Sequence, residues 1–498
     1  MEYFIGVDVG TSSLKSVVFD NLGNIIKSFN EEYQIITPKA NYAEENPKDW
    51  YSACLKTLIE IGKLYPSAKG LSFSGQMHGL VLLDKDDNIL RNAILWCDFR
   101  TSEMKEYITK FISDEEIKKI TGNHIGLSFT LAKLLWVKEN EPDIFKRIDK
   151  VMLPKDYVKY MLTNEFSTEL ADASGMQMVD INTYQYSKTL LDKLGIPLNI
   201  LPPIKKSIDR VGKLRRKIQE ETNLFDLEVV EGAGDQAACA IGSGIYKTNQ
   251  ISLVLGSSGV VLSPIEKENV KDLESNVFIG ANDKPFTMLV TNGCGLSYKW
   301  YKEHLCDYEI NLAKEKNTSV YDILNKEAEN TKPLSNGLFY MPYLNGERDP
   351  HVDPYATGTF IGINQGTNKA DFTRSILEGV GYSLKECLDV LPEKDYKIYV
   401  SGGGANSRLW KTIIASQMNK TLYEVTSQEA GALGATIIAM VGLNYFNSFD
   451  EAINSLIKEK NRTEPMKDWV KLYQSGFNKF KGIYKALRPL YRDLKKEI

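Results

Sequence analysis

The alternation of apolar and polar residues at the start of the chain predicts two strands joined by a tight polar turn. Apolar residues alternate with Gly6 and Asp8 over 5–9, which is the period of a half-buried strand. A glycine and three hydroxyl residues fill 10–13, and the apolar run 17–19 forms the returning strand. Such a turn offers several N–H and O–H donors to a phosphate, and a neighbouring carboxylate suits Mg²⁺. Taken alone, a plain hairpin whose aspartate caps its own backbone explains the pattern equally well.

A second copy of this pattern, about half the chain length away, strengthens the phosphate-binding interpretation. In 251–262 the apolar alternation returns, and Gly256, Ser257 and Ser258 take the places of the glycine and hydroxyl residues of the first turn. A repeat of this length indicates a duplicated domain rather than a solenoid. Val254 stands where the first copy has its aspartate. The sequence therefore predicts two phosphate-binding hairpins and a single metal-binding carboxylate.

We expect two domains that divide near the middle of the chain. The first, 1–245, reads as an α/β layer with a mainly helical elaboration at about 111–201. Asn46 is typical of a helix N-cap and is followed by proline, and an apolar helical stripe continues from there. Further strands or hairpins of this domain are predicted at 25–36, 69–73, 80–90 and 227–230. The second domain, 246–498, begins with the repeated hairpin.

Small residues mark two further places in the second half where a ligand would approach the backbone. A predicted strand at 397–400 leads into Gly402–Gly404, and Asn406 is the expected N-cap of a helix whose N-terminus would face an anion. The predicted helix at 429–440 has a face of glycine and alanine that would let a flat base lie nearby. Each feature also has a plain reading, as a connector or as close helix packing. Only their occurrence together in this order favours a ligand site.

Asp235 follows a predicted strand and begins a predicted helix of small residues. This order places it at the carboxyl edge of a sheet, where open α/β folds bind their ligands. The helix N-terminus is expected to keep the carboxylate ionised, as a general base requires. On its own, an N-cap role is the simpler reading. His78, in a turn at a strand end, is either a satisfied half-buried histidine or a partner for a hydroxyl-rich substrate.

The composition is that of an ordinary globular protein and excludes several function classes. Hydrophobic residues make up 43% and charged residues 25% of the 498 positions, and the net charge of −4 gives no basic field for nucleic acid or an anionic membrane. Six scattered cysteines and four scattered histidines form no zinc motif and favour free thiols in a reducing, cytoplasmic setting. No apolar window is long enough to span a membrane, and the N-terminus does not read as a signal peptide.

Five short motifs give the chain a resemblance to the FGGY carbohydrate kinases that extends over nearly its whole length. The most specific is Gly75-Gln-Met-His-Gly79, and the others are Trp96-Cys-Asp-Phe-Arg100, Leu153-Pro-Lys-Asp-Tyr157, Gly234-Asp-Gln236 and Tyr343-Leu-Asn-Gly-Glu-Arg348. The chain has neither a P-loop nor a G-x-G-x-x-G fingerprint. The family shares the duplicated ATPase fold of actin, hexokinase and the heat-shock chaperones. The resemblance thus implies an α/β protein of two ribonuclease H-like domains with a cleft between them.

The resemblance also implies a role for individual residues. Asp235 would be the catalytic base, and Asp8 the carboxylate that organises Mg²⁺ and the phosphates. The implied sugar-binding residues are Met77, His78, Asp235, Gln236, Trp96, Asp98 and Arg100, the last two shaping the pocket by pairing together. The implied nucleotide-binding residues are Gly10, Thr11, Ser12, Ser13, Lys15, Gly256, Ser257, Ser258, Gly403, Gly404, Asn406 and Ser407. The departures from the family pattern are Ser257 in place of threonine, Cys97 in place of asparagine and Met176 in place of threonine.

The function implied in this way is ATP-dependent phosphorylation of a ketopentose, D-xylulose, at O5. The partners would be the sugar and ATP, with a homodimer as an open possibility and with neither nucleic acid nor membrane. A kinase for ribulose, gluconate, glycerol or 1-deoxy-xylulose is the nearest alternative. An actin-like or chaperone-like nucleotide switch is an alternative of a different class, and a catalytically inactive sugar-binding relative is a third.

Overall fold

The computed structural model describes residues 2–426 and 428–495 and divides into two compact units. Unit 1 is formed by the described residues of 1–246, 264–286 and 426–458. Unit 2 is formed by those of 247–263, 287–425 and 459–498. Each unit contains a β-sheet with helices packed on it, so the predicted α/β class with two sheet-containing parts is confirmed.

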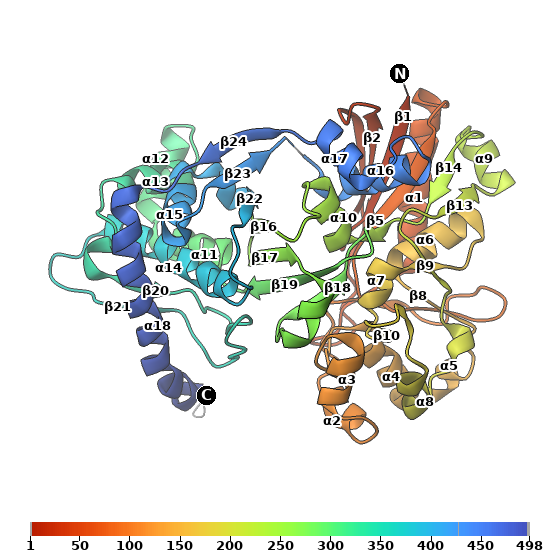
Figure 1. Ribbon diagram of the computed structural model, residues 1–498, viewed down its shortest axis with the longest axis horizontal. Helices are drawn as coiled ribbons and strands as arrows, with labels where there is room; N and C mark the ends of the chain where they lie inside the picture. The colour runs from red at the N-terminus through yellow and green to blue at the C-terminus, as the bar shows by residue number, and fades with distance from the viewer. Residues whose placement is uncertain (1, 427, 496–498) are drawn as a thin grey trace. The chain divides into compact units, whose positions relative to one another are not determined.

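The sheet of unit 1 contains both parallel and antiparallel strands, in the order β13–β14–β5–β1–β2–β3 (Figure 1). Their bounds are β1 Tyr3–Val9, β2 Ser13–Asp20, β3 Ile25–Glu32, β5 Gly70–Gly75, β13 Arg210–Lys213 and β14 Glu228–Val230. The short strand β15, Ala233–Gly234, also pairs with β5. The hairpin β1–β2 is antiparallel, whereas β1 pairs with β5 in parallel and β5 pairs with β14 in parallel.

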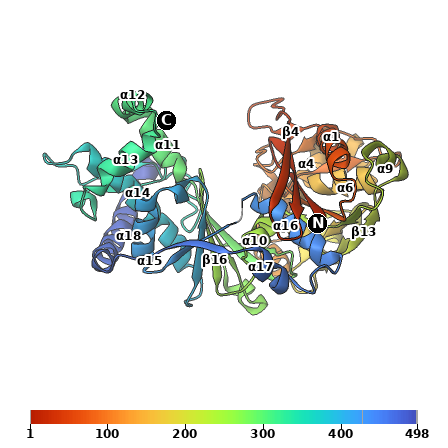
Figure 2. The same cartoon turned by 90° about the horizontal axis from the view of Figure 1, so that it is seen from above.

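Helices cover both faces of this sheet, so β1 is buried rather than half-buried as its alternation predicted. On one face α1, Pro47–Leu64, packs Trp50, Leu58 and Ile61 against the apolar residues of β1. On the other face α16, Ala430–Gly442, lies against β1, β5 and the helix α10, Asp235–Gly242 (Figure 2). The approach is so close that a Cβ on Gly6 would lie 1.9 Å from the carbonyl oxygen of Ala432. Glycine at this position is therefore a packing requirement of the helix above it.

Between residues 104 and 194, unit 1 is mainly helical, with short strands between the helices. Its helices are α2 Met104–Thr109, α3 Asp114–Thr121, α4 Thr130–Asn140, α5 Pro142–Phe145, α6 Pro154–Thr163, α7 Leu170–Ser174 and α8 Lys188–Leu194. Its short strands are β8 Lys150–Met152, β9 Thr168–Glu169, β10 Val179–Asp180 and β11 Gln185–Tyr186. The predicted hairpin at 80–90 is only partly formed, because β6, Val81–Leu83, makes its ladder with β8 and only an isolated bridge with Ile89.

The sheet of unit 2 repeats the strand order of unit 1, as β24–β23–β22–β16–β17–β19. The bounds are β16 Gln250–Leu255, β17 Gly259–Pro264, β19 Pro285–Thr291, β22 Lys397–Ser401, β23 Leu422–Val425 and β24 Glu459–Thr463. Again a hairpin, β16–β17, is antiparallel and its first strand pairs in parallel with a strand from later in the chain, β22. The outermost pair is antiparallel in both sheets. This shared topology supports the duplication inferred from the two hairpins.

The helices of unit 2 enclose a core of aromatic and aliphatic residues that includes Trp410 and Tyr473. Their bounds are α11 Gly295–Leu305, α12 Asp307–Glu315, α13 Val320–Glu329, α14 Lys369–Asp389, α15 Arg408–Met418 and α18 Lys467–Lys495. The N-cap of α15 is Ser407, whose side chain accepts from the backbone N–H of Trp410, and not the predicted Asn406. Asn406 instead ends a short 3₁₀ turn, Gly403–Asn406. The strand β24 was not expected from its charged sequence.

Candidate active site

The polar turn between β1 and β2 is held from several sides in unit 1. The backbone N–H of Gly10 donates to Ser13 at 3.1 Å, and its carbonyl oxygen accepts from the Tyr33 hydroxyl and from Gln76 Nε2. The indole N–H of Trp96 donates to Thr11 Oγ1 at 3.0 Å. A residue predicted to bind sugar and one predicted to bind phosphate are thus in direct contact.

Asp8 lies at the end of β1 with part of its carboxylate exposed. Ser74 Oγ donates to its Oδ1 at 2.8 Å, and Gly431 of α16 leaves room beside Oδ2, where a Cβ would lie 3.1 Å away. Burial raises the pKa of Asp8, while the ammonium of Lys15 opposes this rise. Lys15 itself forms an ion pair with Glu429 at 2.8 Å. One reachable carboxylate beside a hydroxyl-rich turn is a donor set that fits Mg²⁺ carrying phosphate and water ligands.

The turn after β5 fixes His78 in a conformation that few non-glycine residues adopt. Its φ of 67° lies in the left-handed region. The carbonyl oxygen of Gly175 lies 2.8 Å from Nδ1, so Nδ1 carries the proton in this bond, and the ring packs against Phe129 and Phe278. The buried ammonium of Lys133 donates to the carbonyl oxygen of His78 at 3.1 Å. These contacts hold the imidazole in a single orientation.

Asp235 is the first residue of α10 and directly follows β15, as the sequence predicted. Its carboxylate accepts from the backbone N–H of Gln236, and part of the side chain of each of these two residues is exposed. The expectation that the helix N-terminus keeps Asp235 ionised is wrong. Burial, reinforced by the negative charge of Asp8, outweighs the helix end and raises the pKa of Asp235 to about 7. A carboxyl with this pKa is suited to accept a proton near neutral pH.

Met77 connects these elements of unit 1. Its side chain is 5% exposed and packs against Gly175 and Gly234, at each of which a Cβ would lie within 3.0 Å of a Met77 side-chain atom. Met77 therefore lies between the residue that anchors His78 and the residue that precedes Asp235. The predicted sugar-binding residues of the two motifs are brought together at one place.

Asp98 and Arg100 pair with each other, as the sequence analysis expected. Arg100 Nε and Nη2 donate to the two carboxylate oxygens of Asp98 at 2.9 and 2.8 Å, and Nη2 also reaches Glu44 at 2.7 Å. The guanidinium lies over the rings of Tyr42 and Trp136. Both charged side chains are almost fully buried, so their contribution is to the wall of the site. Trp96, at 45% exposed, is the residue of this motif that presents a surface.

The predicted nucleotide-binding residues of the second half line one cavity of about 500 Å³ in unit 2. The members predicted from the sequence are Gly256, Ser257, Gly403, Gly404, Asn406 and Ser407. The members that the sequence analysis missed are Leu255, Gly295, Tyr298, Lys299, Ser319, Tyr321, Asp322, Asn325 and Trp410. Ser258 is not among the lining residues, and its carbonyl oxygen accepts from the N–H of Gly256.

The cavity is lined by aromatic rings and by the polar side chains of Asp322 and Asn325, a combination that suits a nucleoside. The rings of Tyr298 and Tyr321 lie 4.9 Å apart, and Trp410 packs on Tyr298 from another side. The Tyr298 hydroxyl donates to Asn325 Oδ1 at 3.1 Å. The signal that could have identified three of these residues is the clustering of Tyr321, Asp322 and Asn325 directly after Ser319, a residue type that is typical of a helix N-cap and that caps α13 in the structure.

Comparison with known proteins identifies the class to which this fold and these two sites belong. The model of the FGGY family of carbohydrate kinases, N-terminal domain, matches residues 3–242, and that of the C-terminal domain matches 251–443. The chain belongs to the FGGY family of carbohydrate kinases. The family implied by the five sequence motifs is thereby confirmed.

Several members of the family that are similar to this chain over nearly its full length are named xylulose kinase. The chain is 35% identical to the xylulose kinase of Bacillus subtilis, covering 99% of each chain. It is 37% identical to the xylulose kinase of Staphylococcus xylosus, covering 97% of this chain and 100% of the other. A solved structure of ligand-bound xylulose kinase from Lactobacillus acidophilus superposes with a TM-score of 0.91 at 24% identity, covering 99% and 100% of the two chains, which shows the shared fold. Among the described residues, no helix combines the length and the apolar character needed to cross a membrane.

Proposed function

We propose that this chain transfers the terminal phosphoryl group of ATP to O5 of D-xylulose. Membership in a carbohydrate kinase family and full-length relatives named xylulose kinase support this proposal. The observation that carries it is the position of Asp235, a carboxyl with a pKa of about 7, beside Met77 and the turn that holds His78. Phosphoryl transfer to a hydroxyl needs such a base, a positioned acceptor and stabilised phosphate charge.

In the proposed reaction Asp235 accepts the proton of the sugar hydroxyl as the hydroxyl oxygen attacks the terminal phosphorus of ATP, and the bond from that phosphorus to ADP breaks so that ADP leaves. Met77 provides an apolar surface for the carbon chain, and His78 meets a sugar hydroxyl with an imidazole whose orientation is already fixed. The indole of Trp96 covers the site next to the phosphate turn through its bond to Thr11. The second hairpin and the cavity of unit 2 bind the nucleotide.

Asp8 and the Gly10–Ser13 turn would hold Mg²⁺ together with the phosphates. When bound, the ion neutralises negative charge on the phosphate oxygens during transfer. Ser74 keeps one oxygen of Asp8 occupied, which leaves Oδ2 as the atom offered to the ion. We further propose a cytoplasmic enzyme, and a homodimer stays a prediction.

Sugar-dependent release of ADP tests the proposal. The purified chain is incubated with Mg-ATP and each of a set of sugars that includes D-xylulose, ribulose, gluconate, glycerol and 1-deoxy-xylulose. We expect kcat/KM to be highest for D-xylulose, with a product phosphorylated at O5. If kcat/KM is higher for another sugar of the set, that sugar and not D-xylulose is the substrate. ATP turnover that no sugar accelerates would instead favour a nucleotide switch.

A further inference from the structure

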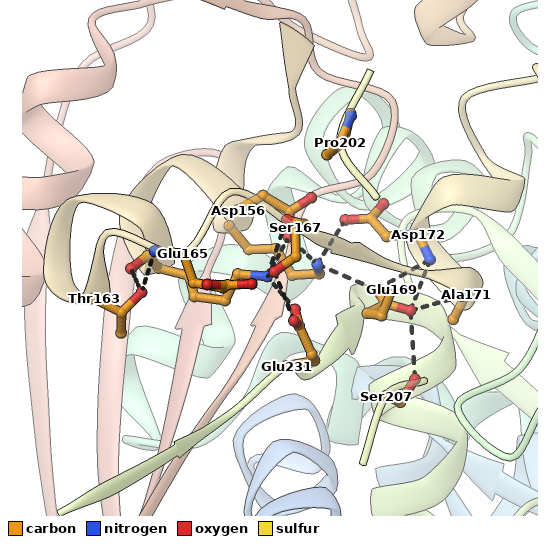
Figure 3. A network of polar contacts seen from close by, with 12 residues as sticks. Asp156, Thr163, Glu165, Ser167, Glu169, Ala171, Asp172, Pro202, Ser207 and Glu231 are labelled. Atoms are coloured by element: carbon orange, nitrogen blue, oxygen red, sulfur yellow. Dashed lines mark hydrogen bonds and ion pairs between the residues drawn. The ribbon is translucent and has the colours of Figure 1, made fainter. Parts of the chain in front are cut away.

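A buried cluster of charged residues, among them Asp156, Glu169, Asp172 and Glu231, lies in unit 1 (Figure 3). Its two lysines come from α6. Lys155 Nζ lies 2.6 Å from Asp156, 3.2 Å from Glu169 and 3.5 Å from Asp172. One turn further along α6, Lys159 pairs with Glu231, to which Ser167 Oγ also donates. All six charged side chains are at most 2% exposed. Lys155 and Asp156 belong to the 153–157 motif, to which the proposed reaction assigns no role.

The charges of this cluster do not balance if every group is ionised. The carboxyls of Asp156, Glu169, Asp172 and Glu231 face only two ammonium groups, and isolated buried charge is costly enough that such groups take up protons. Asp172 is the member best placed to be neutral. Among the described residues, neither of its oxygens has a hydrogen-bond partner, whereas Glu169 accepts from the backbone N–H groups of Ala171 and Asp172.

The electrostatic surroundings of Asp172 act in the same direction. Burial raises its pKa well above the usual value, and the negative charges of Glu169, Asp156 and Asp235 add to this effect. The positive charge of Lys155 opposes the rise. The charged groups named here come from α6, from the cap of α7 and from the start of α10.

Asp172 also touches the backbone that leads to the proposed base. A Cβ on Gly234 would lie 3.2 Å from Asp172 Oδ1, and Gly234 directly precedes Asp235. The same helix, α7, ends next to Gly175, whose carbonyl oxygen accepts from His78. The side chain of Lys155 packs against Gly75, where a Cβ would lie 2.8 Å from its own Cβ, at the end of β5. One buried pair therefore contacts the segments that carry both proposed substrate-contacting groups.

We propose that Lys155 and Asp172 form a positioning pair that fixes the Gly234–Asp235 turn and the anchor of His78 for phosphoryl transfer. Asp172 acts as a neutral acid that fills the space behind Gly234, and Lys155 holds α7 in register with β5. The pair makes no contact with the reacting atoms and acts through Asp235 and His78. This inference rests on the proposed sugar kinase activity.

Three variants of the full-length chain test this role, with kcat and KM measured for D-xylulose and ATP and folding followed by thermal unfolding. Asp172→Ala removes the support behind Gly234, so kcat should fall about 10- to 100-fold while KM for ATP stays within about twofold. Asp172→Asn copies the shape of the neutral acid and should keep kcat within about threefold of the wild type. Ser167→Ala is the matched control, because it removes a buried hydroxyl that bonds to Glu231 in the Lys159 half of the cluster and leaves the contact between Asp172 and Gly234 in place.

The outcomes separate this inference from the proposed function. A wild-type chain that phosphorylates none of the sugars overturns the proposed function, and the positioning role with it. If the wild type is active, then an Asp172→Ala variant with normal kcat overturns only the inference. The same conclusion follows if Ser167→Ala loses as much kcat as Asp172→Ala, or if Asp172→Asn is as impaired as Asp172→Ala, which would rule out the neutral form. Should Asp172→Ala fail to fold, Asp172→Ser serves in the same comparison.

Discussion

The two hairpins, β1–β2 and β16–β17, have the same place in their sheets but different chemistry. Each is antiparallel, and each pairs in parallel with a strand from later in the chain. The first carries Asp8 on β1 and lies in the unit that holds Asp235, whereas the second has Val254 at this position and borders a cavity with aromatic walls. The two copies thus share their topology but differ in the side chains at equivalent positions. In the function proposed above, the first copy serves catalysis and the second binds the nucleotide.

The comparison also shows how packing constrains each copy. Gly6 of the first hairpin lies under the backbone of α16, and its equivalent in the second hairpin is Ser252. Gly431 of the same helix leaves space beside Asp8. Because Gly6 and Gly431 have no side chains, α16 can lie directly against β1 and beside the carboxylate of Asp8. Four experiments test this contrast between the two copies.

Replacing the base in unit 1 should have the largest effect. Asp235→Asn keeps the shape of the side chain but cannot accept the proton, so kcat should fall by about 10²- to 10⁴-fold. Turnover is followed by ADP release, and nucleotide affinity by equilibrium binding. Affinity should be retained, because the proposed nucleotide cavity is formed by residues of unit 2. Near-normal turnover would remove Asp235 from this role.

Making the first hairpin resemble the second should have the next largest effect. Asp8→Val copies Val254 and removes the proposed ligand of Mg²⁺, so kcat should fall by about 10²- to 10³-fold. The thermal midpoint should be unchanged or higher, because a carboxyl whose pKa is raised by burial is lost. A variant that keeps its activity, or that loses it only through unfolding, would contradict the proposed role of Asp8.

Exchanging Gly6 with the residue at the equivalent position of the second hairpin, Ser252, should change stability instead of chemistry. Gly6→Ser places a side chain where a Cβ would lie 1.9 Å from a carbonyl oxygen, so the free energy of unfolding should fall by about 1–3 kcal/mol. The reciprocal Ser252→Gly relieves no such contact and should cost only about 0.5–1 kcal/mol through backbone entropy. Chemical denaturation measures both. Equal losses would show that α16 does not distinguish the two hairpins.

The acidic limb of the pH profile should report the carboxyl of unit 1. The pKa of Asp235 is raised to about 7, and the group acts as a base only when deprotonated. As the pH falls below 7, kcat/KM should therefore decrease about tenfold per pH unit, and above 7 it should level off. Initial rates between pH 5 and 9 measure this limb. A profile that stays flat down to pH 5 would show that the working base has an ordinary carboxyl pKa.

The elements that sequence reasoning predicted well are those with a local signal. The hairpin turns, the Asn46 cap and the start of α10 at Asp235 all follow from residue patterns within a few positions. Placement of Ser407 rather than Asn406 at the N-cap of α15 depended on a 3₁₀ turn that the glycines permit. The roles assigned to the individual site residues stay predictions.

The features that were missed depend on contacts between distant segments. The raised pKa of Asp235 comes from burial and from Asp8, more than two hundred residues away in sequence. The Lys155–Asp172 pair joins two helices whose sequences give no sign of their proximity. Asp322 and Asn325 line the same cavity as the turn of the second hairpin only because the fold brings α13 to that cavity. Such groups form only when the chain packs into its tertiary structure. The alternation and capping patterns of the sequence are local and do not indicate these contacts.

The late position of α16 in the chain has a practical consequence for dissecting this molecule. The helix belongs to unit 1 although it follows two of the three segments of unit 2 in sequence. A recombinant fragment that stops at residue 246 would leave Gly6, Ser74 and the small residues of α10 uncovered, and it should aggregate when expressed. Unit 1 would be obtained on its own only from a design that joins both the segment 264–286 and the segment 426–458 to that fragment.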